Sequence, residues 1–183
     1  MNNISIIPVK NLPEFSPKHD LAIELIKGFE NNNILIENKD VIVVTQKIVS
    51  KVENRLIDNN SENIEELIQK ESLEILRKRG DTVIARTKHG FICANAGIDK
   101  SNIKKGSVLL LPEDPDKTSR DIKKKIEHKI NKKVSVIISD TFGRAWRKGQ
   151  TNIAIGSSGI EPLESYIGEK DAFDNELFAT EIA

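Results

Sequence analysis

A short, strongly apolar run at residues 134–138 constrains the fold more than any other stretch of the chain. Its β-branched side chains are too continuous for a surface strand, and the run is too short for a typical helix. It therefore predicts a buried strand. A second apolar segment, residues 152–155, returns soon afterwards and ends on a glycine.

Polar side chains follow this run where the predicted strand ends. Asp140 and Thr141 offer carboxylate and hydroxyl oxygens, the hard ligands that Mg²⁺ or Mn²⁺ prefers. Arg144 and Arg147, on either side of Trp146, can grip a phosphate or carboxylate and stack on a planar ring. Together they predict a site for a metal and an anionic substrate. The alternative is a turn or helix N-cap followed by a solvated loop with one anchoring tryptophan.

Two other segments can contribute to such a site. Residues 41–44 predict a second buried strand, and Lys47 and Lys51 follow its end, where cations suit the phosphates of a nucleotide. Taken alone, these residues favour the alternative of an edge strand with an exposed turn. Asp99, in the loop 93–102, can bring a second carboxylate to the same ion, although Asp, Asn and Gly loops are mostly ordinary turns.

Periodicity and capping signals predict helices and strands along the whole chain. Three helices are expected: one starting at Ser16-Pro17, one over 61–79 that bends or divides in two, and one behind a capping box at Thr118 and Asp121. Further strands are expected at 4–7, 82–86, 91–95 and 108–111, the middle two as a hairpin.

Composition narrows the class of protein. The chain has 28 basic and 28 acidic residues, and this balance argues against a protein that coats nucleic acid or an anionic membrane. No run approaches the ~18 apolar residues of a membrane span, and a single cysteine, Cys93, fits a reducing cytoplasmic compartment. The sequence contains no P-loop, dinucleotide fingerprint or Cys/His zinc cluster.

Six blocks of this sequence resemble the coenzyme F420:L-glutamate ligase family, the gamma-glutamyl ligases of deazaflavin cofactor biosynthesis. In chain order they are IIPVKNLPEF, DVIVVTQKIVSK, HGFICANAGIDKSN, LLLPEDPD, ISDTFGRAWRKGQTNIAIG and the closing TEIA. The resemblance runs from the first predicted strand to the last residue, and the order of six separate blocks makes it specific.

The resemblance implies a fold and a reaction. The fold would be α+β, with mixed and antiparallel sheets, flanking helices and no P-loop, in a homodimer with sites near the subunit interface. Family members use GTP and Mg²⁺ or Mn²⁺, with K⁺ as a further candidate, to add L-glutamate to the coenzyme F420 precursor through an acyl phosphate. Neither a nucleic acid nor a membrane is implied as a partner.

The resemblance also implies residue roles. Asp99, Asp140 and Thr141 correspond to the metal-binding positions of the family. The positions that contact GTP correspond to Leu12, Pro13, Glu14, Phe15, Gln46, Lys51 and Asn102. From chemistry alone, we assign Asp140 and Arg144 to catalysis, and Arg144, Trp146 and Arg147 to the phosphate and ring of the deazaflavin substrate.

Two departures from the family pattern accompany these expectations. Ala145 stands where the family usually has proline, which loosens the loop without removing a functional group. Family members also continue past TEIA, so residues 1–183 are expected to be one domain lacking the C-terminal part. Two other functions stay open: a related amide ligase acting on another acid, and a non-catalytic homologue that only binds ligand.

Overall fold

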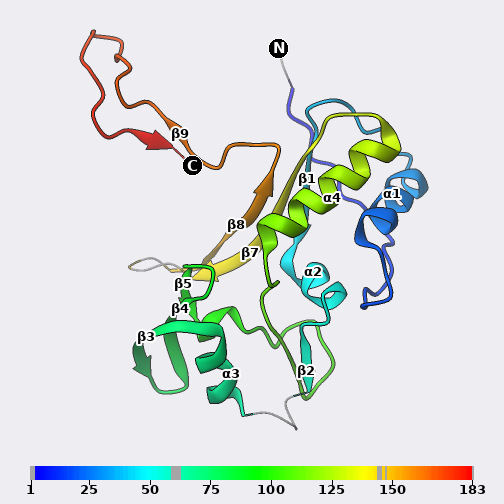
Figure 1. Cartoon of the computed structure of the whole chain (residues 1–183), viewed down its shortest axis with the longest axis vertical. Helices are drawn as coiled ribbons and strands as arrows, with labels where there is room; N and C mark the ends of the chain where they lie inside the picture. Colours follow the sequence, from blue (N-terminus) through cyan, green and yellow to red (C-terminus); the bar gives the residue numbers. More distant parts are fainter. Residues whose placement is uncertain (1–2, 59–62, 144–145, 147, 183) are drawn as a thin grey trace.

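Three strands that are distant in the sequence form the central sheet of the computed structural model (Figure 1), which describes residues 3–58, 63–143, 146 and 148–182. Strand β1 (Val41–Thr45) pairs in parallel with β7 (Ser135–Gly143), and β7 pairs antiparallel with β8 (Gln150–Ser158). The predicted strand at 134–138 and its returning partner are thereby confirmed.

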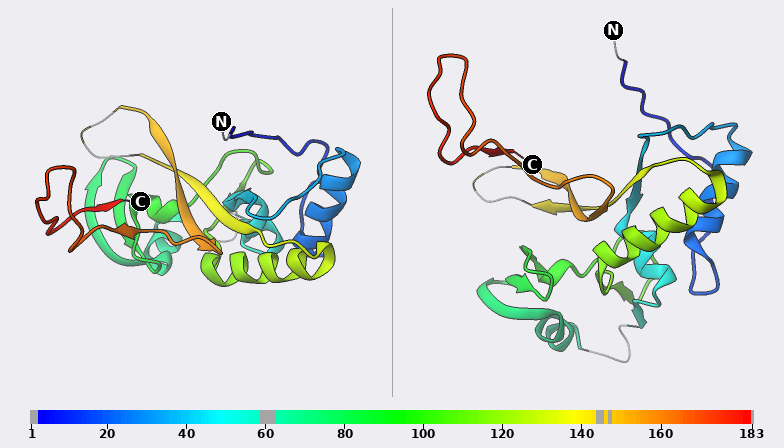
Figure 2. Two further views of the ribbon diagram at one scale, coloured as in Figure 1. Left: turned by 90° about the horizontal axis from the view of Figure 1, so that it is seen from above. Right: turned by 45° about the horizontal axis from the view of Figure 1, so that its top comes forward.

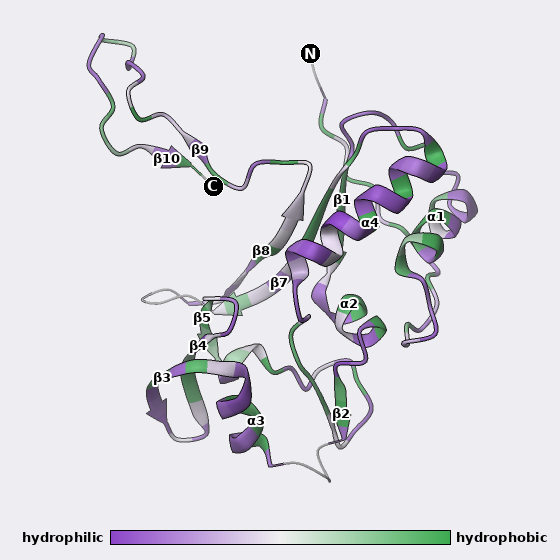
Figure 3. Ribbon diagram, in the orientation of Figure 1, coloured by the Kyte–Doolittle hydropathy of each residue, from purple (hydrophilic) through white to green (hydrophobic). Residues whose placement is uncertain are grey.

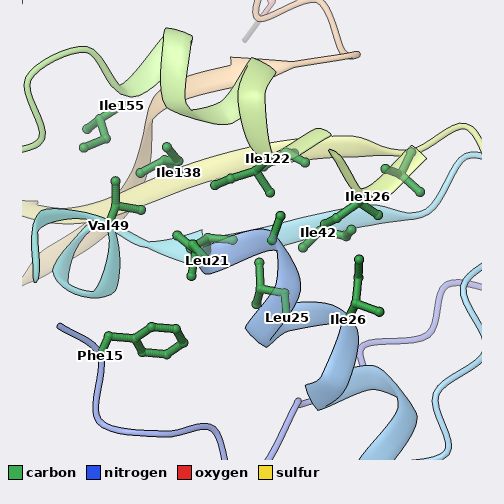
Figure 4. Close-up of a cluster of buried hydrophobic side chains, with 14 of the residues drawn as sticks. Phe15, Leu21, Leu25, Ile26, Ile42, Val49, Ile122, Ile126, Ile138 and Ile155 are labelled. Atoms are coloured by element: carbon green, nitrogen blue, oxygen red, sulfur yellow. The ribbon is translucent and has the colours of Figure 1, made fainter. Parts of the chain in front are cut away.

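Two helices, α1 (Leu21–Asn31) and α4 (Pro115–Ile130), cover one face of this sheet. Strand residues alternate between faces, so Ile42 and Ile138 point into the helix layer and are buried there. Figure 4 shows how side chains of α1 and α4 meet those of the strands. The expectation of a buried strand at 41–44 is only half right, because the open face of the sheet leaves Val43 62% exposed.

Most of the elements between β1 and α4 form smaller units, which lie in the lower half of Figure 1. Helix α2 (Gln46–Val52) follows β1 directly, and β2 (Leu56–Asp58) pairs antiparallel with β6 (Ser107–Leu109). We define the small lobe as residues 64–98. Its elements are α3 (Ile64–Glu71), β3 (Ser72–Arg79), β4 (Thr82–Thr87), β5 (Ile92–Ala94) and the 3₁₀ turn η1 (Asn95–Gly97).

The last part of the chain forms a terminal arm, residues 160–182, which extends away from the sheet in both views of Figure 2. Two short strands, β9 (Glu164–Ser165) and β10 (Glu181–Ile182), pair antiparallel at its base. Hydrophobic and hydrophilic segments alternate along it (Figure 3). The exposed large apolar side chains of the arm are Ile160, Leu163, Ile167, Phe173, Phe178 and Ile182.

Two helix starts differ from the predictions, although both helices exist. The Ser16 hydroxyl contacts the His19 ring instead of capping a helix, and Asp20 is the N-cap of α1. Helix α4 begins before the expected capping box, because Asp114 accepts the Lys117 amide and a proline follows at the first helical position. In both cases the sequence offers two capping residues a few positions apart, and the structure uses Asp20 and Asp114.

Two other predictions of secondary structure are wrong. The expected helix at 61–79 ends at Glu71, and the following eight residues form β3, because pairing with β4 outweighs their helix propensity. The expected strand at 4–7 has no ladder partner among the described residues, and Ile4 and Ile6 are each 93% exposed. The hairpin of β4 and β5 is confirmed. Within the described part of the chain, none of the helices is long and apolar enough to span a membrane.

Candidate functional site

A cavity of about 360 Å³ opens where the carboxyl end of β1, the loop after β5 and the β7–β8 hairpin meet. Figure 1 shows β5 beside the far end of β7. Polar side chains dominate the lining, and two of them are carboxylates from separate segments. The lining residues are Thr45, Lys47, Cys93, Ala94, Asn95, Gly97, Ile98, Asp99, Ser101, Asp140, Thr141, Phe142, Gly143 and Gln150.

The parallel pairing of β1 and β7 brings Lys47 and Asp140 together. Thr45 pairs with Ser139 at the end of the parallel ladder. The residues that follow each of these two in the sequence therefore lie close together at the same edge of the sheet. The sequence suggested that Asp140 and Thr141 lie beyond the strand end. They lie instead inside β7, because pairing with β8 continues the strand to Gly143.

Asp99 comes from a loop with unusually well-fixed backbone. Its amide and carbonyl both pair with Leu109, at 2.9 Å in each direction, which ties the loop to β6. The residues before it, Asn95, Ala96 and Gly97, all have left-handed φ values, of 50°, 53° and 74°. Ala96 in that conformation is strained, and such strain persists only where the surroundings enforce it. The backbone of this loop is therefore held in one conformation by its contacts.

Lys47 connects the two carboxylates of the cavity. Its ammonium forms an ion pair with Asp99 and donates a hydrogen bond to the Ser101 hydroxyl at 2.9 Å. Burial raises the pKa of Asp140, while the Thr141 amide and the Lys47 ammonium oppose that rise. Burial likewise lowers the pKa of Lys47, opposed by Asp140 and assisted by Lys51. Lys47 and Asp140 are thus close enough to influence each other.

Thr141 also borders the cavity, but its hydroxyl has a partner already. The Oγ1 atom donates to Oδ1 of Asn152 across the β7–β8 ladder at 2.7 Å. A hydroxyl that donates one hydrogen bond keeps its oxygen lone pairs for other ligands. The role of Thr141 in metal binding therefore stays a prediction.

A second cavity, of about 240 Å³, is lined in part by Ile103 and Lys104, which follow Asp99 on the same loop, and it contains several of the residues expected to contact GTP. Lys51 pairs with Glu14 at 2.5 Å and donates to the Asn102 carbonyl at 3.5 Å. The lining combines an apolar wall with cationic side chains. It consists of Glu14, Phe15, Ser16, Pro17, Lys51, Asn54, Leu56, Ile103 and Lys104.

Four residues expected to contact GTP, which are Leu12, Pro13, Gln46 and Asn102, do not line either cavity in the described structure. Leu12 packs against Gly28 of α1, and Pro13 is exposed. Gln46 is fully buried, where its Oε1 accepts the Ser50 hydroxyl at 2.8 Å while its Nε2 has no partner. A buried amide without a partner costs free energy. The GTP contacts of all four stay predictions.

Of the residues proposed to bind the substrate, Trp146 is described by the structure and does not line either cavity. Trp146 is fully exposed at the tip of the β7–β8 hairpin, with a left-handed φ of 58°. Arg144 and Arg147 lie outside the described residues. Gly143 and Gln150, at the base of the same hairpin, do line the cavity.

Sequence reasoning missed two features of this site. Lys47 was considered only as a phosphate contact, and its pairing with a carboxylate remote in sequence left no local signal. Cys93 lines the cavity, but burial, with a smaller contribution from Asp140, raises the pKa of its thiol to about 11. The thiol therefore stays protonated at neutral pH, and Cys93 behaves as a small buried apolar residue.

Comparison with known protein families gives one match over most of the chain. The family described as F420-0:Gamma-glutamyl ligase matches residues 10–183. This range includes both cavities and the terminal arm.

Curated proteins from methanogenic archaea are similar over a comparable range. The coenzyme F420:L-glutamate ligase of Methanocaldococcus jannaschii is 41% identical over 187 residues, covering 89% of this chain and 75% of that protein. The protein of the same name from Methanococcus maripaludis is 40% identical over 88% of this chain and 75% of its own length. That from Methanothermobacter thermautotrophicus is 33% identical over 98% of this chain and 78% of its own length.

Proposed function

The chain belongs to the F420-0:gamma-glutamyl ligase family, and we propose that it adds L-glutamate to the coenzyme F420 precursor in a reaction that consumes GTP and requires a divalent metal. One observation carries the metal and nucleotide parts of this proposal. Two carboxylates and a lysine share the larger cavity, and a second cavity with further lysines is lined in part by residues that follow Asp99 on the same loop.

The donor set of the larger cavity fits Mg²⁺ or Mn²⁺. Among the described residues, no group of three or more His, Cys, Asp or Glu side chains forms a self-contained metal cage. Mg²⁺ characteristically uses one or two carboxylates and completes its shell with water and substrate phosphate oxygens. Asp99 and Asp140 would supply the carboxylates and Thr141 a hydroxyl. When bound, the ion would neutralise charge on the phosphate oxygens.

The two cavities suggest how a nucleotide lies on the protein. Lys47 borders the larger cavity and Lys51 the smaller one, and they occupy positions i and i+4 of α2, on the same helix face. We place the GTP phosphates along this face, with the γ-phosphate in the larger cavity. Phe15 and Ile103 would then offer apolar surface to the rest of the nucleotide.

The proposed reaction has two steps, which are formation of an acyl phosphate and its conversion to an amide. A carboxylate oxygen of the F420 precursor attacks the γ-phosphorus of GTP, which gives an acyl phosphate and GDP. The amine of L-glutamate then attacks the acyl carbon, forms the amide bond and releases inorganic phosphate. The residues around the cavity would hold the two reactants in line and exclude water from the acyl phosphate.

The proposal also covers the oligomeric state of the protein and its location in the cell. The terminal arm carries exposed apolar side chains on a segment that leaves the body, which is the arrangement expected of a surface that packs on a second copy. We therefore propose a homodimer, measurable by analytical ultracentrifugation; a monomer at micromolar concentration would contradict it. A free, buried cysteine agrees with the proposed cytoplasmic location.

Mass spectrometry of the glutamate-free F420 precursor tests the function directly. The precursor is incubated with the protein, GTP, Mn²⁺ and L-glutamate, and a mass increase by glutamate units is expected. Asp140→Ala should abolish that increase, whereas Asp121→Ala, which removes an exposed carboxylate from α4, should leave it intact. An unchanged precursor with folded wild-type protein would contradict the proposal.

A further inference from the structure

Lys47 lines the same cavity as the two carboxylates of the proposed metal site. It is paired with Asp99, held by Ser101, and close enough to Asp140 for mutual electrostatic influence. Two carboxylates brought into one partly buried cavity repel each other unless a cation in the same cavity offsets their charge. In the metal-free protein, that cation is the Lys47 ammonium.

The lysine and a divalent ion compete for the same oxygens. A metal bound by Asp99 needs a carboxylate oxygen that faces the ion, and close approach of an ammonium to that ion is opposed by like charge. We propose that Lys47 is a built-in counterion of the metal site, which a divalent cation must displace from Asp99 when it binds. This inference rests on the metal site of the proposed function.

Once displaced from Asp99, the Lys47 ammonium would be available to bind another anion. Its side chain is long and flexible, and it is attached to the first turn of α2, at the edge of the cavity proposed for the γ-phosphate. A released ammonium can therefore turn to the phosphate that accompanies the metal. Lys47 would act as a positioning residue that links metal binding to nucleotide binding.

Lys51 provides a matched comparison on the same helix. It lies one turn after Lys47 and also carries a positive charge, but its ion pair is with Glu14 outside the larger cavity. Removing either lysine changes the charge of this surface by the same amount. Only the removal of Lys47 frees Oδ2 of Asp99, whose Oδ1 accepts the Ser101 amide at 2.7 Å.

Mn²⁺ binding in the absence of nucleotide tests this inference without measuring activity. Electron paramagnetic resonance counts free Mn²⁺ during a titration of the full chain. Lys47→Met should bind Mn²⁺ about fivefold more tightly than wild type, which corresponds to about 1 kcal/mol. Lys51→Met should remain within about twofold of wild type, because its change in long-range charge is screened.

A second substitution keeps the test informative if Lys47→Met is poorly folded. Lys47→Arg replaces the ammonium with a guanidinium that can bind a carboxylate through two hydrogen bonds, so Mn²⁺ affinity should fall severalfold. The metal-free Lys47→Met protein should also melt at a lower temperature than wild type and gain more from added Mn²⁺.

The outcomes separate this inference from the proposed function. Loss of Mn²⁺ binding in Asp140→Asn, with unchanged or weaker binding in Lys47→Met, would overturn the counterion role and leave the metal site in place. A wild-type protein that binds no Mn²⁺ would overturn both. Equal tightening in Lys47→Met and Lys51→Met would show a general charge effect and would also overturn displacement.

Discussion

The central sheet and the small lobe differ in the size of their apolar cores. The apolar core of the sheet unites β1, β7 and β8 with α1 and α4, and includes fully buried side chains such as Ile126 and Ile138. The buried core of the small lobe consists of Ile68, Val83, Ala85 and Ala96. Burial of apolar area is the main source of stability, so the lobe depends far more on its attachment than the sheet does.

The candidate site lies between these two regions. Asp140 and Lys47 belong to the central sheet and its first following helix, whereas Cys93 and Asn95 come from the small lobe. Asp99 follows the lobe but is tied to β6 through Leu109. One wall of the site is therefore rigid, and the opposite wall belongs to a region that can open at lower free energy.

Truncation in the central core should have the largest effect. Ile138 is fully buried in β7, and Ile138→Ala removes its methyl groups and leaves a cavity. The free energy of unfolding should fall by about 3–4 kcal/mol. Urea denaturation followed by circular dichroism measures this change. A loss below about 1 kcal/mol would contradict the view that this sheet dominates stability.

A methyl group at Gly97 should disturb the junction between the regions. Gly97 has φ +74°, and a Cβ there would lie 2.7 Å from Leu111 Cδ1, whose side chain is buried. Gly97→Ala should cost about 2–3 kcal/mol, from backbone strain together with overpacking. Because Asp99 is two residues away, Mn²⁺ affinity should fall as well. Unfolding in urea and the Mn²⁺ titration check the two parts separately.

Truncation in the small lobe should have a smaller and local effect. Ile68→Ala removes the largest buried side chain of that core and should cost about 2 kcal/mol, the low end for such changes, because few neighbours surround it. Amide hydrogen exchange should accelerate across residues 64–98 and stay slow in β7. Equal acceleration in both regions would show that they unfold as one unit.

The smallest effect is expected at the contact between α1 and α4. Asp20 caps α1 and accepts a hydrogen bond from Lys125, which, with the two capping amides, lowers the pKa of its carboxyl group against an opposing contribution from burial. A lowered folded pKa stabilises the protein above the ordinary carboxyl range near pH 4, and that contribution disappears as pH falls through the folded pKa.

Two substitutions at Asp20 separate the contribution of its helix cap to stability from that of its ion pair with Lys125. Asp20→Ala should cost about 1 kcal/mol at pH 7 through loss of the cap. Asp20→Asn keeps a capping oxygen and should cost about 0.5 kcal/mol, because the Asp20 side chain is 33% and the Lys125 side chain 57% exposed. Thermal unfolding from pH 7 to pH 2 should bring Asp20→Asn and wild type together at the acid end. A constant difference would contradict the assigned cause.

The accuracy of the sequence predictions follows the same division between regions. Strands β1 and β7 and the apolar faces of α1 and α4 were predicted because their local patterns agree with the core they enter. In the small lobe, residues 72–79 were expected to be helical, and they form a strand only because β4 lies alongside. Where the core is thin, long-range backbone pairing decides the structure, and local propensity is a poor guide.

By itself, the sequence determined the α+β class, the positions of strands β1 and β7, and the family to which the chain belongs. It also determined which residue types could form a metal and phosphate site, because carboxylates and lysines at strand ends are chemically suited to both. Only the tertiary structure decided that Lys47 pairs with Asp99, 52 positions away, and that Asp140 lies within a continuing strand. Such contacts depend on the register between β1, β7 and β8 and on the anchoring of a distant loop, which no local pattern encodes.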